Sequence, residues 1–268
     1  QKYEKINVGG TATVVAAALK TNVTRVVFAS TIAVYGPSSR GQPLEDKLTS
    51  QACREEAHGQ SGYGTAKNGI LNEDTMPQPD TLYAQTKLTA EKIVLNARGS
   101  DGQSLGTVLR FGAVYGARIK GNYERLMRAL AGNRFIPIGD GCNRRTLVYD
   151  KDVAGAVVLA VQHRAAAGKI YNVTDGQFHE LREIIAAICA ALGRRPPRFS
   201  IPVGLARCMA GIVEDVVRVT GRRSPVNRAL IDKYIEDIAV DGMRIQKELG
   251  FVPQYDLASG WLETVDGI

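Results

Sequence analysis

The sequence predicts an α/β protein built on a doubly wound parallel sheet, and three observations lead to this fold class. Two runs, 23–31 and 106–111, are strongly apolar and rich in β-branched residues, which is typical of strands buried on both faces. Segments with an apolar recurrence at helical spacing separate such runs along the chain. Strands and helices therefore alternate, as a doubly wound sheet requires.

The expected elements follow one another in a regular order. Residues 6–11 lead into an alanine-rich helix at 14–19, and the strand at 23–31 comes next. A helix at 83–97 is followed by a Gly-containing turn and by the strand at 106–111. Further along we expect helices at 123–131, 153–162, 180–192, 203–220 and around Trp261, and strands at 145–149 and 169–173.

The segment 37–80 interrupts this order. It is polar, rich in Gly, Pro and Ser, and shows little periodicity. Long loops of this kind in compact domains are functional lids or insertions. The strand before it ends on Ser30 and Thr31. Because ligands of open α/β sheets bind beyond the carboxyl ends of the strands, these two hydroxyl groups are candidate site residues.

The stretch 81–92 carries the most specific signal. It places a phenol, Tyr83, four residues before an ammonium, Lys87, and residues four apart lie on one face of a helix. A free phenol has a pKa of about 10, and a cation within roughly 4–6 Å lowers this pKa toward the range of efficient proton transfer. Tyr63 and Lys67 have the same spacing, but Gly and Asn-Gly surround them, which is typical of a loop. On spacing alone, a chance pair on an exposed helix is the commoner explanation.

Composition narrows the classes of function. The 268 residues include 34 Lys and Arg against 27 Asp and Glu, a formal net charge of +7. The basic residues are dispersed and form no stripe with aromatic residues, so nucleic acid is not the expected partner. No apolar run reaches the ~18 residues of a membrane span, and the first residues lack a signal-peptide pattern. We therefore expect a cytoplasmic protein with no membrane partner.

The residue types that bind metals show no ligand spacing. Four Cys and three His are scattered along the chain. A metal site would need such residues in closely spaced pairs or groups. We therefore expect no metal. We interpret four residues as reduced thiols: Cys53, Cys142, Cys189 and Cys208.

Several short motifs, taken together and in order, carry a resemblance that covers almost the whole chain. The motifs are Asn7-Val8-x-Gly10-Thr11, Phe28-Ala29-Ser30-Thr31-x-x-Val34-Tyr35-Gly36, Tyr83-x-x-x-Lys87 with Glu91, Leu109-Arg110 with Val114-Tyr115-Gly116, Gly139-Asp140-Gly141 with Arg145, and Asp152-Val153-Ala154. The chain resembles the extended short-chain dehydrogenase/reductase family, in particular its nucleotide-sugar epimerase and dehydratase branch. The resemblance implies a Rossmann-like sheet, NAD or NADP as cofactor, and a smaller, mostly helical C-terminal substrate domain.

The resemblance also implies how the chain is divided. Residues 1–115 and 147–174 are expected to form the dinucleotide-binding domain. Residues 116–146 and 175–268 are expected to form the substrate-binding domain. On the same ground we expect a homodimer, assembled through a helix bundle that includes the helix carrying Tyr83.

The resemblance implies a role for each residue of the expected active site. Thr31 would hydrogen-bond the reacting sugar oxygen, with Ser30 one residue earlier as the alternative. Tyr83 would be the general acid and base, and Lys87 would keep the phenol ionisable and bind the cofactor ribose. The residues expected to line the cofactor are Asn7, Ala29, Ser30, Tyr83, Lys87, Phe111 and Gly112.

The substrate that the resemblance implies is a nucleotide-diphosphate sugar. Arg145 would meet the diphosphate, because a guanidinium is a rigid and always charged fork for phosphate oxygens. A surface ion pair is the alternative role for Arg145. Asn122 matches a position at the entrance of the substrate segment. A second phosphate-binding arginine is expected among Arg218, Arg222 and Arg223.

The chain departs from the family pattern at three points. No Gly-x-x-Gly-x-x-Gly follows an initial strand, although this motif is the family's pyrophosphate site. We therefore expect a truncated form with weak or absent cofactor affinity. Ala113 stands where many relatives have an asparagine that touches the sugar. The segment between Thr31 and Tyr83 is longer than usual, which is expected to change access to the site.

These expectations lead to an NAD(P)-dependent oxidoreductase or epimerase of a nucleotide-diphosphate sugar, such as a 4-epimerase or a 4-keto reductase. A hydroxysteroid- or dihydroflavonol-type dehydrogenase of the same family is one alternative, and Arg145 argues against it. A non-catalytic, truncated dinucleotide-binding protein is the other. The missing glycine motif favours that second alternative, whereas the set of Thr31, Tyr83 and Lys87 opposes it.

Overall fold

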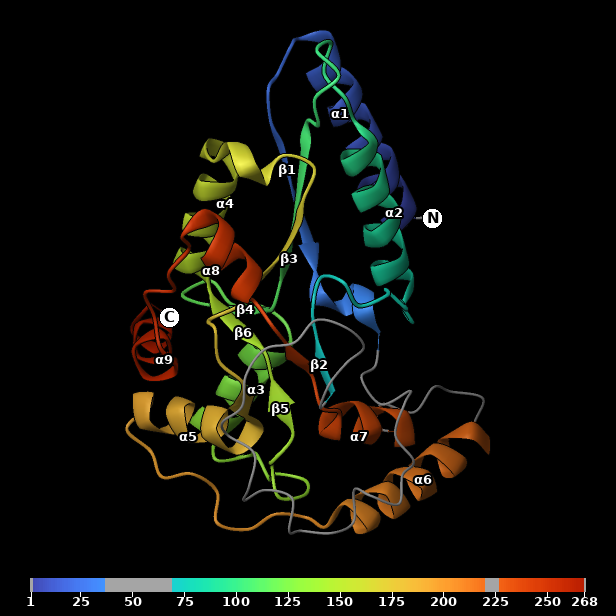
Figure 1. Cartoon of the computed structure of the whole chain (residues 1–268). Helices are drawn as coiled ribbons and strands as arrows, with labels where there is room; N and C mark the ends of the chain where they lie inside the picture. The colour runs from blue at the N-terminus through green and yellow to red at the C-terminus, as the bar shows by residue number, and fades with distance from the viewer. Residues whose placement is uncertain (1, 37–68, 220–226, 268) are drawn as a thin grey trace.

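A three-stranded parallel sheet in the order β1-β3-β7 forms the centre of the molecule (Figure 1). The computed structural model describes residues 2–36, 69–219 and 227–267. The strands of this sheet are β1 (Val26–Thr31), β3 (Gly106–Phe111) and β7 (Ile170–Val173). Thr31, Phe111 and Val173 are partners in register, so the three strands end level with one another. Their carboxyl ends therefore meet at one edge.

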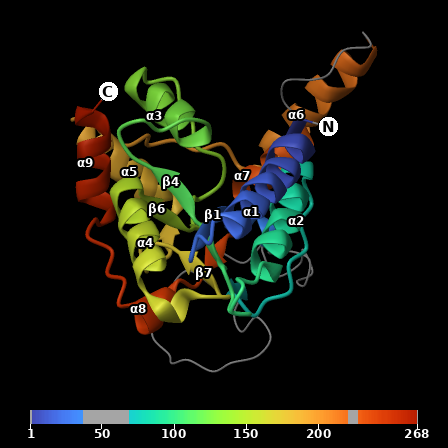
Figure 2. The ribbon, with the colours of Figure 1, turned by 90° about the horizontal axis from the view of Figure 1, so that it is seen from above.

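Helices cover both faces of this sheet. On one face lie α1 (Gly10–Lys20) and α2 (Leu82–Asn96), whose apolar side chains cluster with those of β1 and β3. On the other face lie α4 (Asp150–Gln162) and α8 (Met243–Leu249). Figures 1 and 2 show the sheet between these two helical layers. The predicted doubly wound α/β fold is confirmed.

Shorter elements complete the described chain. A π-helical segment, Glu4–Gly9, runs directly into α1, and the 3-10 helix η2, Ile32–Tyr35, follows β1. The paired short strands are β2 (Ile70–Leu71) with β9 (Ala239–Val240), β4 (Ala113–Tyr115) with β6 (Leu147–Tyr149), and β5 (Arg144–Arg145) with β8 (His179–Glu180), the last pair antiparallel. The other helices are α3 (Asn122–Ala131), α5 (Leu181–Ala191), α6 (Val203–Val219), α7 (Arg228–Ile235), α9 (Leu257–Asp266) and a 3-10 turn at Arg164–Ala166.

Most predicted elements are present, with ends that differ by a few residues. The strand expected at 106–111 has those bounds, and the helix expected at 83–97 is α2. The strand expected at 145–149 is divided at Thr146 into β5 and β6. The Thr146 hydroxyl donates to the carbonyl of Ile238 and accepts from the amide of Val240, 3.0 Å in each case, which ties this point to β9.

Two expectations about local structure are wrong. The run at 23–31 was expected to be buried on both faces, yet within β1 only Ser30 is buried and Ala29 is exposed. The reason is that β1 pairs with β3 alone and is an edge strand of the described sheet. The segment 37–80 was expected to lack regular structure, and 37–68 lie outside the described residues. At its end, however, β2 pairs with β9, so this part belongs to the folded body.

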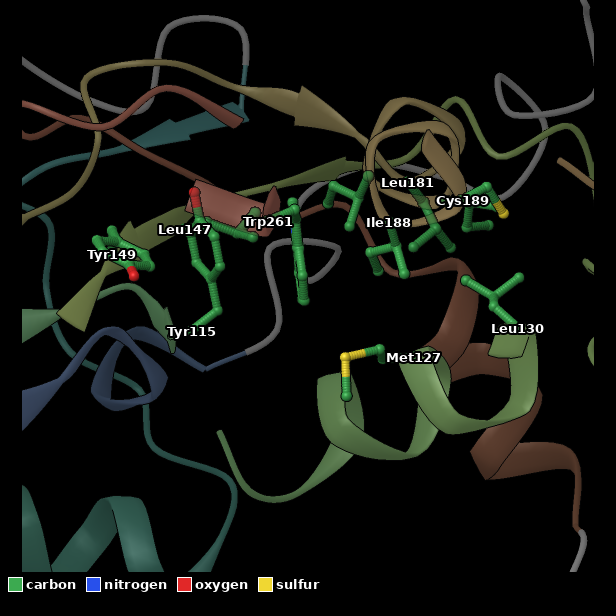
Figure 3. Close-up of a cluster of buried hydrophobic side chains, with 11 residues drawn as sticks. Tyr115, Met127, Leu130, Leu147, Tyr149, Leu181, Ile188, Cys189 and Trp261 are labelled. Carbon is green, nitrogen blue, oxygen red and sulfur yellow. The ribbon is translucent and has the colours of Figure 1, made fainter. Parts of the chain in front are cut away.

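A second hydrophobic core lies between β4, β6, α3, α5 and α9, and Figure 3 shows its side chains. Trp261 of α9 is fully buried and stacks on Tyr115 of β4, with ring centroids 4.7 Å apart. Met127 of α3 and Ile188 of α5 close the same cluster. This core joins residues from both sides of the expected domain boundary, and the division into two domains stays a prediction.

A buried histidine makes the stability of this region depend on pH. His179 Nε2 lies 2.7 Å from Asp175 Oδ2, and both side chains are more than nine-tenths buried. Burial lowers the pKa of His179, but the hydrogen bond to Asp175 and its charge outweigh burial, so this pKa is raised. A raised folded-state pKa stabilises the fold fully below the unfolded value of about 6.5, and this contribution is lost as the pH rises through the folded value.

We expect Asp175→Asn to lower the free energy of unfolding by roughly 2 kcal/mol at pH 5.5, the size of a hydrogen bond to a charged group. At pH 9, where a smaller fraction of His179 is protonated, the loss should be smaller. Urea unfolding of both proteins at the two pH values measures the difference. An equal loss at pH 5.5 and pH 9 would show that the charge of His179 does not contribute.

Candidate active site

The helix α2 presents Tyr83 and Lys87 in its first two turns. Thr81 caps the helix, because its hydroxyl accepts a hydrogen bond from the Ala84 amide at 3.2 Å. The helical spacing that the sequence predicts for Tyr83 and Lys87 is therefore present. Ala84, Thr86 and other small or apolar residues form the buried face of α2 against the sheet.

Lys87 connects α2 to β1. Its Nζ donates to the carbonyl oxygen of Ala29 at 2.9 Å and lies 4.9 Å from the centroid of the Phe28 ring. Burial lowers the pKa of Lys87, and the charge of Glu91 partly opposes this effect. The ammonium is thus held near the carboxyl end of β1, the edge at which α/β sheets bind ligands.

Tyr83 stands beside Lys87 and is 38% exposed. The Lys87 ammonium lies 5.9 Å from the centroid of its ring, and the ring of Tyr3 meets it edge to face at 5.7 Å. Burial, and then the neighbouring Tyr3, raise the pKa of Tyr83. The lowered pKa that the spacing suggests is therefore not found in this arrangement, in which Lys87 is bonded to Ala29.

The two hydroxyl residues at the end of β1 have different surroundings. The Thr31 side chain is half-buried and accepts a hydrogen bond from the Ala33 amide at 3.2 Å, which caps η2. Ser30 is buried, and its hydroxyl donates to Glu91 of α2 at 2.5 Å. Because adjacent residues of a strand point to opposite faces of the sheet, the side chains of Ser30 and Thr31 point in opposite directions. The hydroxyl of Ser30 is already hydrogen-bonded to Glu91.

Three further residues of the expected cofactor site surround this edge. Asn7 donates from Nδ2 to the hydroxyl of Thr86 at 3.0 Å, which fixes the π-helical segment on α2 one residue before Lys87. Phe111 ends β3 beside Thr31, and Gly112 follows with its amide bonded to the carbonyl of Val173. The structure thus gathers these residues around the ends of the central strands and the start of α2.

The residues expected to bind the substrate lie in the part of the molecule built on β5 and α3. The Nη2 of Arg145 donates to the carbonyls of Lys233 (3.1 Å) and Tyr234 (2.7 Å), in the last turn of α7. Cations are favoured at the carboxyl end of a helix, so Arg145 also holds α7 in place. Asn122 is the first residue of α3 and is exposed. The side chain of Arg218 and residues Arg222 and Arg223 lie outside the described part of the chain.

One set of residues near this site received no role from the sequence, although Tyr35, Glu91 and Arg110 belong to the motifs of the family resemblance. Glu91, Arg110, Tyr35 and Asn172 form a buried hydrogen-bonded network beneath the carboxyl ends of the strands. The available signal was Arg110, a charged residue inside an apolar strand, because charges are almost never fully buried unless they are paired. Tyr3, which covers Tyr83, carried no such signal.

Neither a metal centre nor a membrane span is found in the described residues. No group of three or more His, Cys, Asp or Glu side chains is placed there to hold a metal ion. Every helix of residues 2–36, 69–219 and 227–267 is too short or too polar to cross a lipid bilayer.

Comparison with known proteins identifies the family. The model of the NAD dependent epimerase/dehydratase family matches residues 1–174, more than half of the chain. The chain therefore belongs to this family, as the motifs around Thr31, Tyr83 and Lys87 predicted. Because the family is NAD dependent, the prediction of NAD or NADP as cofactor is confirmed for the family to which the chain belongs.

Two curated relatives align with nearly the whole chain. N-acetyl-alpha-D-glucosaminyl-diphospho-ditrans,octacis-undecaprenol 4-epimerase of Escherichia coli O157:H7 is 23% identical over 96% of this chain and 69% of its own length. UDP-glucose 4-epimerase of Vibrio cholerae is 22% identical over 98% of this chain and 68% of its own length. The chain thus spans about two-thirds of the length of these relatives.

Solved structures share the fold. MoeE5 in complex with UDP-glucose and NAD superposes with a TM-score of 0.65 at 24% identity, covering 97% of this chain and 70% of that one. UDP-glucuronic acid 4-epimerase from Bacillus cereus in complex with NAD gives a TM-score of 0.64 at 17% identity, with coverage of 97% and 66%. At these identities the likeness establishes the Rossmann-like architecture.

Proposed function

We propose that the protein is an NAD(P)-dependent oxidoreductase or epimerase of a nucleotide-diphosphate sugar, acting as a 4-epimerase or a 4-keto reductase. The observation that carries the proposal is the pair Tyr83 and Lys87, held by α2 at the carboxyl end of β1 with Lys87 bonded to Ala29. This pair unites a proton-transfer group and a fixed cation at the edge where ligands of α/β sheets bind. Membership of the family supports it.

The residues at this edge fit the nicotinamide half of the cofactor. Tyr83 is 38% exposed and Lys87 is half-buried beside it, so both can be reached from solvent. We infer that Lys87 binds the ribose and that Asn7, Ala29, Ser30, Phe111 and Gly112 line the same half. Ser30 would contribute backbone atoms, because its hydroxyl is bonded to Glu91. When the cofactor is bound here, its oxidised nicotinamide would accept a hydride and its reduced nicotinamide would donate one.

The protein's own residues would move the proton and orient the sugar. Tyr83 removes the proton from a sugar hydroxyl as hydride leaves the carbon, or returns it to the oxygen of a keto sugar. Thr31 hydrogen-bonds the same oxygen and fixes its distance to the phenol. Proton transfer of this kind contributes about 10²–10⁴-fold to a rate.

Arg145 is the proposed contact for the diphosphate. Its Nη2 is bonded to two carbonyls of α7, whereas Nε and Nη1 have no hydrogen bond to any residue in the described ranges. These donors can face phosphate oxygens while α7 holds the guanidinium in place. Asn122 at the start of α3 is the second proposed contact. A homodimer remains a prediction from the family resemblance.

The relatives act on diphospho-sugars, by their names, and this supports the choice of substrate class. One is an epimerase of a sugar on a diphospho-undecaprenol, and another is a UDP-glucose 4-epimerase. A sugar attached to a diphosphate is common to both. We therefore propose that this protein recognises the diphosphate and the sugar.

The test is incubation of the protein with NAD or NADP and a panel of UDP- and dTDP-sugars. A 4-epimer that forms without net change in NADH would identify an epimerase. A 4-keto sugar consumed with stoichiometric oxidation of NADH or NADPH would identify a reductase. Turnover of a steroid or flavonoid alcohol, with no activity toward any sugar of the panel, would refute the proposal.

A further inference from the structure

A row of polar side chains crosses the central sheet just beneath the candidate active site. Ser30 of β1 pairs in register with Arg110 of β3, and Arg110 pairs with Asn172 of β7. Their exposed fractions are 5%, 2% and 0%. Buried polar groups cost free energy unless their hydrogen bonds are satisfied, so such a row in an apolar sheet requires partners.

Glu91 of α2 supplies partners to two of these residues. Its carboxylate accepts from the Ser30 hydroxyl at 2.5 Å, from Arg110 Nε at 3.0 Å and from Arg110 Nη2 at 2.7 Å. Its exposed fraction is 1%. Glu91 lies four residues after Lys87 and eight after Tyr83, so these three residues follow one another along one side of α2.

The same network reaches the segment that follows Thr31. The guanidinium of Arg110 lies 4.9 Å from the centroid of the Tyr35 ring, and the Tyr35 hydroxyl donates to Asn172 Oδ1 at 2.8 Å. Tyr35 is the last residue of η2, the 3-10 helix that Thr31 caps. The network therefore holds both elements that carry the proposed catalytic residues, α2 and the end of β1.

Stability alone is a poor explanation for such a buried ion pair. Removing two charges from water costs several kcal/mol per ion, and apolar replacements of similar volume are often neutral or stabilising. What apolar contacts do not provide is direction, because the hydrophobic effect is non-directional. A carboxylate that accepts three directed hydrogen bonds from two strands fixes two properties of its helix. These are the position of the helix along the sheet and its rotation about its own axis.

We propose that Glu91 is a positioning residue, which holds α2 against β1 and β3 so that Lys87 reaches the Ala29 carbonyl and Tyr83 stands at the carboxyl end of β1. The proposal rests on the proposed function for its effect on catalysis. Its structural part, the position of Lys87, can be measured without turnover.

The test compares three variants with the unchanged protein. Glu91→Leu combined with Arg110→Met replaces the ion pair by apolar groups of similar volume, and Glu91→Gln keeps a polar side chain. Asp152→Asn is the matched control, because Asp152 is also buried and its carboxylate accepts from the amides of Gln254 and Tyr255, within a different part of the fold. Thermal unfolding establishes which variants are folded.

The first measurement is the pKa of Lys87. The lysines are reductively methylated with ¹³C, their NMR signals are recorded as the pH is changed, and the signal of Lys87 is assigned by its absence in Lys87→Arg. Burial near Ala29 lowers the pKa of Lys87 in the unchanged protein. If the double variant releases α2, this pKa rises toward its ordinary value, whereas in Asp152→Asn it is unchanged. In Glu91→Gln, loss of the Glu91 charge without movement of α2 would lower the pKa of Lys87 further, because that charge raises it.

The second measurement is turnover of the sugar of the UDP- and dTDP-sugar panel that the unchanged protein accepts. We expect the double variant to lose about 10–100-fold in kcat with little change in KM, because a misplacement of about 1 Å in a catalytic group can cost 10²-fold. The pH dependence of kcat should shift in the same variant, and Asp152→Asn should show neither effect.

The outcomes separate the two claims. A folded double variant with the Lys87 titration and the pH profile of the unchanged protein would overturn the positioning role. If the double variant does not fold, Glu91→Gln decides by the same criteria, a raised Lys87 pKa supporting the role and a lowered or constant one refuting it. If no sugar is turned over by the unchanged protein, the proposed function fails, and the Lys87 titration still tests Glu91.

Discussion

Tyr83→Phe is expected to lower kcat for the sugar substrate by about 10²–10⁴-fold, the usual contribution of a general acid and base. The substitution removes one hydroxyl and keeps the ring that meets Tyr3 edge to face. The side chain is 38% exposed, so the change in the free energy of unfolding should stay within about 0.5 kcal/mol. Steady-state kinetics and urea unfolding of the same preparation measure both quantities.

The chain offers a matched control for this substitution. Tyr63 has the same spacing to Lys67 that Tyr83 has to Lys87. Tyr63→Phe should therefore leave kcat unchanged if Tyr83 acts as the general acid and base because of its position in α2, and not because of its spacing to a lysine. Equal losses in the two variants, or full activity in Tyr83→Phe, would contradict the role of Tyr83.

The pH dependence gives this role a second signature. Burial and Tyr3 raise the pKa of Tyr83, so the phenol is protonated at neutral pH and its ionised fraction grows as the pH rises. Oxidation of the sugar, which needs the ionised form as base, should therefore accelerate with pH. In Tyr83→Phe this rise should disappear.

Trp261→Ala is expected to lower the free energy of unfolding by about 3–5 kcal/mol, as large aromatic truncations in cores do. Trp261 is fully buried and stacks on Tyr115 at 4.7 Å, within the core that joins α3, α5 and α9 to the sheet strands β4 and β6. The cavity would remove contacts from every side of this cluster. Urea or thermal unfolding measures the loss.

Phe199→Ala is the control for this second prediction. Phe199 is also aromatic, but 84% of it is exposed, so its truncation should change the free energy of unfolding by less than about 0.5 kcal/mol. A loss below about 1 kcal/mol in Trp261→Ala would show that the core between the sheet and α9 contributes little to folding.

Local pattern was sufficient for the main elements of the fold. The strand at 106–111 was predicted with its observed bounds because an apolar run rich in β-branched residues follows the Gly-containing turn. The helix α2 was predicted within one residue because good helix formers, with an apolar recurrence at helical spacing, follow Lys87. Both signals lie within a few residues of the element that they define.

Features that depend on partners distant in sequence were not predictable in this way. The two-residue strand β2 exists through its pairing with β9, about 170 residues later in the chain. Burial of the phenol, and then the neighbouring Tyr3, raise the pKa of Tyr83, and the Lys87 ammonium is bonded to Ala29. The spacing of Tyr83 and Lys87 contains none of these facts. The anchoring of Arg145 to α7 is likewise a tertiary contact.

The most direct test of the central claim is a crystal structure of the protein with a nicotinamide dinucleotide and the nucleotide-diphosphate sugar that it turns over. We predict one sugar oxygen within hydrogen-bonding distance, about 2.6–3.2 Å, of both the Tyr83 hydroxyl and the Thr31 hydroxyl. A sugar seated elsewhere, for example in the hollow of about 370 Å³ beside Asp175, Gln246 and Tyr255, would contradict the account. So would a complex in which Tyr83 and Thr31 face different ligands.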